Sequence, residues 1–299
     1  MGIVTASRTR SALVVLALGT LAGLPDEAAA EETVSAEGAV SHDNNLSRAL
    51  SASDIVSDTA LNLAASGGFH FALGERDTVT LTGDLRASQF GRFHGMNSVA
   101  LGGTVSWGRK FGLGAFVPWT RVSASFAGER YGENVRDGLR TNVTLRAGQR
   151  LSERLELSGG GSFERFRADN VTQVVPRLSG DAFSLEGRSL FGRADYVLDD
   201  RWAVFAGARA RNGDVTSSTR FNPEIFSYSS ALTPDPAFGS DYIAYRLSGA
   251  TTWDFIAGTS LAISDYSSVN LAVSRALTYA SGGIEYQSTQ INASIIFNY

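Results

Sequence analysis

Residues Thr78–Gln89, with the sequence TVTLTGDLRASQ, decide the fold class of this chain. Apolar or small residues such as Val79 and Leu81 alternate there with polar or charged residues such as Thr80 and Asp84. A period of two places the two kinds of residue on opposite faces of an extended strand. The segment therefore predicts a β-strand with one apolar and one polar face.

The same alternation runs through Leu139–Leu151 and Tyr245–Leu261. Strands of soluble proteins usually have about 5–6 residues, whereas a tilted strand that crosses a bilayer needs about 9–11. After the first 30 residues, the chain has no apolar run long enough for a transmembrane helix. Length and alternation together favour strands that cross a membrane.

Short polar connections alternate along the chain with longer ones. Membrane β-barrels of the bacterial outer membrane have short periplasmic turns and longer external loops, so this pattern assigns the sides as well as the strands. We predict an all-β protein, a closed antiparallel transmembrane β-barrel of about 12 strands, because a membrane-spanning sheet must pair all its edges. The predicted strands span residues 33–42, 59–73, 77–90, 98–110, 116–131, 139–151, 155–167, 182–198, 202–211, 242–262, 269–280 and 286–299.

The longest predicted connection is residues 212–241. It contains four aromatic residues, Phe221, Phe226, Tyr228 and Phe238, which is more apolar surface than a solvated loop usually carries. We therefore expect some of these rings to pack, either inside the barrel or against a partner.

The first 30 residues have the pattern of a secretory signal peptide. Arg8 and Arg10 precede the apolar segment Ala12–Leu24, and alanines at positions 28–30 offer a cleavage site. The apolar segment is shorter than the roughly 20 residues of a membrane-spanning helix, so a membrane anchor is the weaker interpretation. We predict a signal peptide at residues 1–30 and a barrel domain at residues 31–299.

The chain ends on an alternating segment whose last residue is aromatic. Ile295, Phe297 and Tyr299 share one face and alternate with Ile296 and Asn298. This segment resembles the C-terminal assembly signal of Gram-negative outer-membrane β-barrel proteins, in which the last residue is most often Phe. The resemblance implies a location in the cell outer membrane, among outer-membrane lipid and lipopolysaccharide, and recognition by the barrel-assembly machinery. It points to the class of outer-membrane barrels and to no subfamily.

Composition excludes several classes of function. The chain has no Cys, three His, 19% charged residues and a formal net charge of −4. The absence of Cys excludes disulfides and cysteine-based sites, and an acidic balance without basic runs is not typical of nucleic-acid-binding proteins. The sequence also contains no phosphate-binding or dinucleotide-binding fingerprint. We predict no cofactor, no metal site and no nucleic-acid partner.

A hydrolase built on a barrel is a further alternative. Outer-membrane phospholipases use a His–Ser pair with an Asn, and the nearest candidates here are His94, Asn97 and Ser98. Their spacing differs from the short His-x-Ser-Asn stretch of that family, and nothing in the sequence supplies the third group that orients a catalytic base. We therefore predict that the protein is not an enzyme.

The polar faces of the predicted strands carry many charged side chains, which we expect to line the lumen. The basic residues assigned to the lumen are Arg86, Arg121, Arg140, Arg146, Arg150, Arg188, Arg209, Arg211 and Arg246. The acidic residues assigned to it are Asp84, Glu129, Glu156, Glu164 and Asp254. Glu186, Arg193 and Asp195 receive the same assignment, although an apparent change of phase at residues 188–190 suggests a β-bulge there.

Two interpretations of these charges remain open. Either an excess of Arg lines a water-filled pore and favours anions, or the charges pair with one another inside a filled barrel. The first predicts a porin-like channel for passive diffusion of small hydrophilic solutes, anionic ones among them. The second predicts a structural or partner-binding barrel that forms the membrane component of a larger outer-membrane assembly. A soluble periplasmic β-domain is a third and weaker interpretation.

Overall fold

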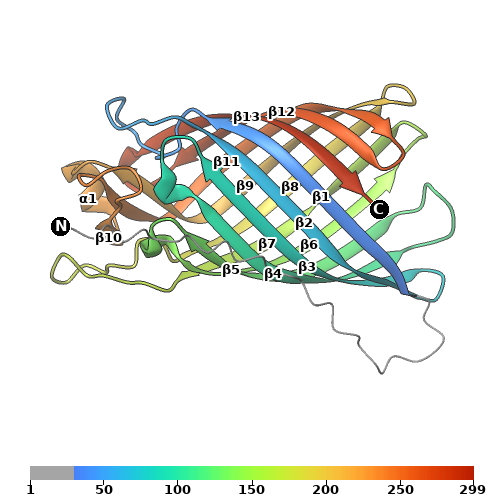
Figure 1. Ribbon diagram of the computed structural model, residues 1–299, viewed down its shortest axis with the longest axis horizontal. Helices are drawn as coiled ribbons and strands as arrows, with labels where there is room; N and C mark the ends of the chain where they lie inside the picture. Colours follow the sequence, from blue (N-terminus) through green and yellow to red (C-terminus); the bar gives the residue numbers. More distant parts are fainter. Residues whose placement is uncertain (1–29) are drawn as a thin grey trace, which may run out of the picture.

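The computed structural model describes residues 30–299, which form one β-barrel (Figure 1). The predicted signal peptide lies outside the described residues, apart from Ala30 at the start of β1. The strands are β1 (Ala30–Asp43), β2 (Asp58–Leu73), β3 (Asp77–Phe90), β4 (Ser98–Lys110), β5 (Trp119–Tyr131), β6 (Gly138–Arg150), β7 (Leu155–Ala168), β8 (Leu185–Val197), β9 (Trp202–Thr219), β10 (Ala231–Pro234), β11 (Ile243–Ser264), β12 (Ser267–Tyr279) and β13 (Glu285–Asn298). The connections contain the short helix α1 (Pro223–Tyr228) and the 3₁₀ turns η1 (His94–Met96), η2 (Asn134–Arg136) and η3 (Ser281–Gly283). Within residues 30–299, no helix is long and apolar enough to cross a membrane.

The sheet closes on itself. Consecutive strands pair in antiparallel fashion, and β13 returns to pair with β1 from Ser35 opposite Asn298 to Asp43 opposite Gln290. β11 pairs directly with β9, because the short β10 stands outside the ring. All the strands except β10 therefore form a closed 12-stranded barrel, which confirms the predicted fold class and strand number. We call the two ends of the barrel the long-loop end and the short-turn end.

The two faces of the barrel wall differ as the alternation predicts. Leu101, Phe126 and Leu145 on the outer face are 56%, 61% and 54% exposed. The residues between them along each strand point inward and are mostly small, polar or charged. An uncovered apolar surface of this extent is unfavourable in water and is typical of a wall that lipid surrounds.

Residues 212–241 differ most from the sequence-based expectation of one long loop. β9 continues to Thr219, and β11 begins at Ile243, so both strands run past their pairing with β8 and β12. β10 pairs with the edge of β11 that β12 leaves free. The polar sequence of residues 215–219 (VTSST) has no clear alternation, and this is why the extension is not predicted. We call residues 214–248 the cap.

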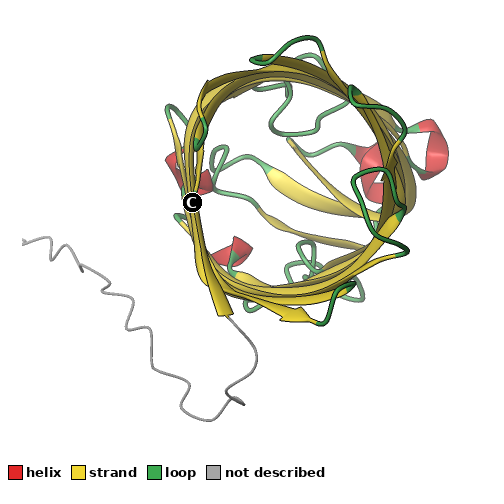
Figure 2. Ribbon diagram, turned by 90° about the vertical axis from the view of Figure 1, so that its right-hand side faces the viewer, coloured by secondary structure: helices red, strands yellow, loops and turns green. Residues whose placement is uncertain are grey.

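The cap bends across the long-loop end of the barrel. The register of β9 and β11 shifts between Leu247 and Ala250. Gly249 lies in this bulge with a φ of 70°, a conformation that strongly favours glycine. Figure 2, which views the barrel from the short-turn end, shows strands and loops of the far end crossing the opening of the ring. Beyond the bulge, β9 and β11 therefore leave the barrel wall and cover its mouth.

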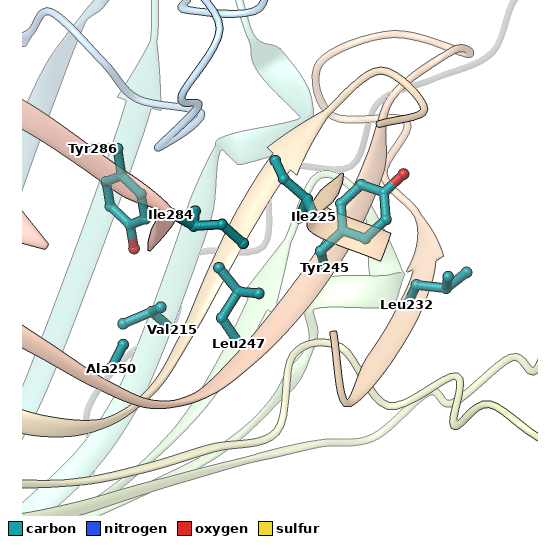
Figure 3. Packing of buried hydrophobic residues seen from close by; sticks show 8 residues of the cluster. All are labelled: Val215, Ile225, Leu232, Tyr245, Leu247, Ala250, Ile284 and Tyr286. Carbon is teal, nitrogen blue, oxygen red and sulfur yellow. The ribbon is translucent and has the colours of Figure 1, made fainter. Parts of the chain in front are cut away.

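The cap has a small apolar core of its own. Ile225 of α1, Tyr245 and Leu247 of β11, and Ile284 just before β13 are each at most 1% exposed (Figure 3). Val215, Leu232, Ala250 and Tyr286 complete the cluster. Full burial of such a side chain contributes about 1.5–3 kcal/mol. The cluster therefore keeps the cap folded and attaches it to the connection between β12 and β13.

Candidate functional site

Cross-strand register shows which charged side chains face the lumen, because directly opposed residues lie on the same face of a sheet. Arg121 is opposite Arg146, and Arg209 is opposite Asp254. The same relationship, followed from strand to strand, places most of the predicted set on the inner face. The residues so placed are Arg86, Arg121, Arg140, Arg146, Arg150, Arg209, Arg211, Asp84, Glu129, Glu156, Glu164 and Asp254.

Several of these charges neutralise one another. The Nε atom of Arg140 donates to Glu129 Oε1 at 2.5 Å, and its Nη2 atom donates to Oε2 at 3.2 Å. Arg209 donates to Asp254 at 2.8 Å, and Arg211 donates to Glu164 at 2.6 Å. Arg140, Arg209 and Arg211 are therefore held by carboxylates of the same wall and add little free charge to the lumen.

Four other inward arginines have no such partner. Arg86, Arg121, Arg146 and Arg150 form no ion pair with any residue in the range 30–299. All four lie on β3, β5 and β6, within a run of four consecutive strands. The uncompensated positive charge of the lumen is thus concentrated on one side of the wall.

The phase of β8 corrects two predicted positions. β8 pairs with β7 and β9 without a break in register, so the suspected β-bulge is absent from this part of the described chain. Arg188 is opposite Phe163 on the outer face, and Glu186 shares that face. Their predicted place in the lumen is wrong, whereas Arg193 and Asp195 point inward and pair at 2.7 Å. Apolar residues occupy both phases of this strand, as at Leu190 and Phe191, so its phase is not evident from sequence.

Arg246 also lies elsewhere than predicted. It belongs to the cap, beyond the bulge that shifts the phase of β11. Its Nη1 atom donates to the carbonyl of Ser184 at 3.0 Å, and its Nε atom donates to Ser230 Oγ at the same distance. Arg246 thus joins the cap to the connection between β7 and β8 instead of lining the barrel wall.

The sequence-based assignment missed acidic residues on β1. Glu31 is opposite the inward His70, and Glu37 is opposite Ala64, which is itself opposite Arg86. Asp43 lines the cavity beneath the cap. The outward face of β1 carries polar residues such as Glu32 and His42 as well as apolar ones, so the alternation that reveals the other strands is weak there. With these carboxylates included, the lumen is rich in both signs of charge.

A cavity of about 480 Å³ lies beneath the cap. Its lining includes Arg48, Arg209, Arg211, Glu164, Asp254 and Tyr286. A cavity of this size with so many polar groups is the kind of space that water occupies. The upper lumen is therefore a polar chamber with the cap as its roof.

The tip of the cap reaches the opposite wall. In the ring order, β9 and β11 stand across the barrel from β3 and β4. The ring of Phe238 in the cap lies 5.3 Å from that of Phe93, in the connection between β3 and β4. Arg136 of η2 donates through Nε to Asp235 Oδ1 at 3.1 Å and through Nη2 to Oδ2. The cap thus spans the mouth from wall to wall.

The near edge of the cap rests on the connection between β1 and β2. The amide of Ser218 donates to the carbonyl of Ser47 at 2.9 Å, and Ser217 Oγ donates to the carbonyl of Arg48 at 2.8 Å. Arg220 pairs with Asp54 at 2.8 Å and with Asp241 at 2.6 Å. The hydrogen bond from Arg220 holds the pKa of the Asp241 carboxyl below its usual value. The connection between β1 and β2 therefore also fastens the cap through polar contacts.

The remaining predicted residues have simple structural positions. Ile295 and Phe297 lie on the outer face of β13, and the ring of Tyr299 lies 5.9 Å from that of Tyr266 at the short-turn end. His94 Nδ1 contacts the carbonyl of Phe90 at 3.0 Å, and Asn97 Oδ1 accepts from the amide of Phe90 at 2.7 Å. These two residues shape the connection between β3 and β4. In the part of the chain that the structure describes, no three His, Asp or Glu side chains converge as metal ligands.

No protein-family model matches the chain, and no curated protein matches it. Solved membrane barrels do match its fold. An outer membrane channel from Pseudomonas putida F1 superposes with a TM-score of 0.50 at 10% identity, covering 93% of this chain and 97% of that one. For the outer membrane channel DcaP of Acinetobacter baumannii the TM-score is 0.45 at 8% identity, with 93% and 100% covered. For the translocator domain of the autotransporter NalP from Neisseria meningitidis it is 0.42 at 13% identity, with 89% and 88% covered. The similarity to the Pseudomonas channel shows that the chain has the fold of a membrane β-barrel.

Proposed function

We propose that this protein is an outer-membrane channel for passive diffusion of small hydrophilic solutes. The observation that carries the proposal is the contrast between the two faces of one wall. The outer face exposes large apolar residues such as Leu101 and Leu145, and the inner face presents charged residues to a polar chamber. A lipid-covered outside combined with a wet, charged inside is the arrangement that water-filled barrels use.

The proposal places the protein in the cell outer membrane, where the signal peptide at residues 1–30 would deliver it. Outer-membrane lipid and lipopolysaccharide would contact the outer wall, and the barrel-assembly machinery would recognise β13. The support is the outward position of Ile295 and Phe297 on the last strand, in line with the resemblance of the C-terminus to an assembly signal. The cap and the long loops would then face the outside of the cell.

The cap determines how freely solutes pass through the channel. It is bound across the mouth by the pair Arg136–Asp235 and by the contact between Phe93 and Phe238. Solutes that enter from the long-loop end must pass between the cap and the wall. We therefore infer that conductance in this state is low and that release of the cap increases it.

The same cap favours a second candidate function. A barrel whose mouth is covered by a folded segment also suits a structural or partner-binding barrel within a larger outer-membrane assembly. In that case the lumen charges stabilise the wall, as the pairs Arg140–Glu129 and Arg211–Glu164 do. The two functions differ in whether the isolated barrel conducts ions.

Planar-bilayer recording of the purified, folded protein tests the proposal. A channel gives stepwise currents, and these increase in a variant that lacks residues 214–248 with a short linker between β9 and β11. Heat-modifiable migration on gels is the control that both proteins are folded barrels. Silence of both proteins at all voltages contradicts the channel and supports the partner-binding barrel.

A further inference from the structure

The lumen contains two arginines in a position that a stable sheet normally avoids. Arg121 of β5 and Arg146 of β6 are directly opposite each other on the inner face. Like charges in this relationship destabilise a sheet, because their side chains are neighbours. Neither arginine forms an ion pair with any residue from Ala30 to Tyr299. The repulsion within the wall is thus left uncompensated.

On the two strands that flank this pair, glycines are opposite the arginines. Gly108 of β4 is opposite Arg121, and Gly160 of β7 is opposite Arg146. The row across four neighbouring strands therefore reads Gly, Arg, Arg, Gly. Neither flanking position carries a side chain of its own, and the Thr78 hydroxyl lies close to Gly108, where a Cβ atom would come within 2.9 Å of it. The row therefore holds two neighbouring positive charges and no acidic side chain.

Arg146 is held in place by its neighbours. Its guanidinium lies 5.6 Å from the centre of the Trp119 ring, and its Nη2 atom donates to Ser158 Oγ at 2.8 Å. The Trp119 ring lies against the backbone of Gly148, where a Cβ atom would come within 2.6 Å of it. The buried Nε atom of Arg146 has no hydrogen-bond partner among the described residues. One arginine is therefore positioned with an unused donor, while Arg121 stays exposed beside it.

We propose that Arg121 and Arg146 form a binding site for a small oxyanion, such as a carboxylate or phosphate group, in the channel lumen. This proposal rests on the proposed channel function and names the class of solute that the channel favours. An anion between the two guanidiniums removes their repulsion and accepts charge-assisted hydrogen bonds from both. Arg provides planar donors that match the geometry of an oxyanion.

A direct binding measurement tests the site independently of conduction. Trp119 reports on Arg146, so we would use the full-length barrel with Trp107, Trp202 and Trp253 each changed to Phe and titrate it with inorganic phosphate in detergent micelles. The expected result is a saturable change in Trp119 fluorescence that Arg121→Gln weakens by about tenfold, the size of effect expected from losing one charged partner. Arg121→Lys is expected to weaken binding less than Arg121→Gln does, because it keeps the charge but loses the planar donors.

Two matched variants distinguish binding at a local site from attraction by the overall electrostatic field of the lumen. Arg86→Gln removes an unpaired lumen charge on β3, and Arg188→Gln removes a charge from the outer face. Both are expected to leave phosphate binding within about twofold of the parent, which is less than 0.5 kcal/mol. Equal weakening by Arg86→Gln, or a titration that does not saturate, overturns the proposed site.

Bilayer recording separates failure of the site from failure of the channel. Phosphate added on the short-turn side should reduce the chloride current of the wild-type protein and should do so less in Arg121→Gln. Currents that phosphate blocks equally in both proteins leave the channel intact and contradict the site. Saturable phosphate binding in a barrel that never conducts supports the site and contradicts the channel.

Discussion

Arg136 and Asp235 form a bidentate salt bridge across the mouth of the barrel, between the β5–β6 connection and the tip of the cap. Asp235 is completely buried, and the Arg136 side chain is 13% exposed. The guanidinium of Arg136 lies 4.5 Å from the centre of the Phe183 ring and 5.4 Å from that of Phe238. A pair of this kind resists separation, because removal of one partner leaves a buried charge uncompensated.

Asp235→Asn should loosen the cap. Loss of one partner of a buried pair costs about 3–5 kcal/mol, and the neutral amide leaves the charge of Arg136 among aromatic rings. We expect faster proteolysis within residues 214–248 and larger currents in planar bilayers. Asp265→Asn, in an exposed turn at the short-turn end, is the control for removing one carboxylate. Wild-type protease resistance in Asp235→Asn would show that the pair does not hold the cap.

A disulfide between residues 95 and 237 should fix the cap in its closed position. A Cβ atom built on Gly95 lies 3.0 Å from the Cβ atom of Ala237, which is shorter than the roughly 3.5–4.5 Å of disulfides, so the two segments must move apart slightly to form the bond. The chain has no native Cys, so the double variant Gly95→Cys/Ala237→Cys has only one possible intramolecular bond. We expect low conductance after oxidation and recovery after reduction. Either single variant is the control, and identical currents in the oxidised and reduced states argue against a cap that limits passage.

Gly249→Ala should weaken the bend that carries the cap over the mouth. Gly249 has a φ of 70°, and a left-handed conformation costs a residue with a Cβ atom about 1–2 kcal/mol. Thermal unfolding of the cap, followed by proteolysis at increasing temperature, should begin earlier in this variant. Gly128→Ala is the matched control, because a Cβ atom there meets nothing within 4 Å. Equal behaviour of the two variants would mean that the bulge does not depend on glycine.

Leu145→Arg should destabilise the folded barrel in lipid. Leu145 is 54% exposed on the outer face, and an Arg near the midplane of the bilayer costs a barrel about 2–4 kcal/mol. Denaturant titration in lipid vesicles measures this loss. Thr144→Arg, one residue earlier and directed into the lumen, should cost less. A reversed order of the two variants would contradict the assignment of the faces.

The contact between Arg220 and Asp241 should survive mild acid. The hydrogen bond from Arg220 lowers the pKa of Asp241, and a carboxyl group whose folded-state pKa is lowered stabilises the fold above its unfolded pKa of about 4. That contribution is lost only as the pH falls through the lower, folded-state value. We expect protease resistance of the cap to be unchanged between neutral pH and about pH 4. Below this range the wild type should lose resistance, whereas Asp241→Asn should lack this acid-dependent step.

Strand positions were predictable where lipid on one face and water on the other select alternating apolar and polar residues. The predicted spans 77–90 and 98–110 coincide with β3 and β4, because alternation is unbroken there. The phase of β8 was not predictable around Arg188, since apolar residues occupy both faces of that strand. Glu31 and Glu37 were not predicted for a related reason, because the outward face of β1 mixes polar residues such as Glu32 with small ones.

The sequence by itself determined that the chain forms a long-stranded antiparallel barrel, because a period of two is a local property that each strand carries alone. Only the tertiary structure decided that residues 214–248 close the mouth, since the cap depends on contacts such as Phe93 with Phe238 between residues far apart in the chain. The tertiary structure also decided which charges neutralise each other. Pairing depends on register between neighbouring strands, which leaves Arg140 with a carboxylate and places Arg121 opposite Arg146.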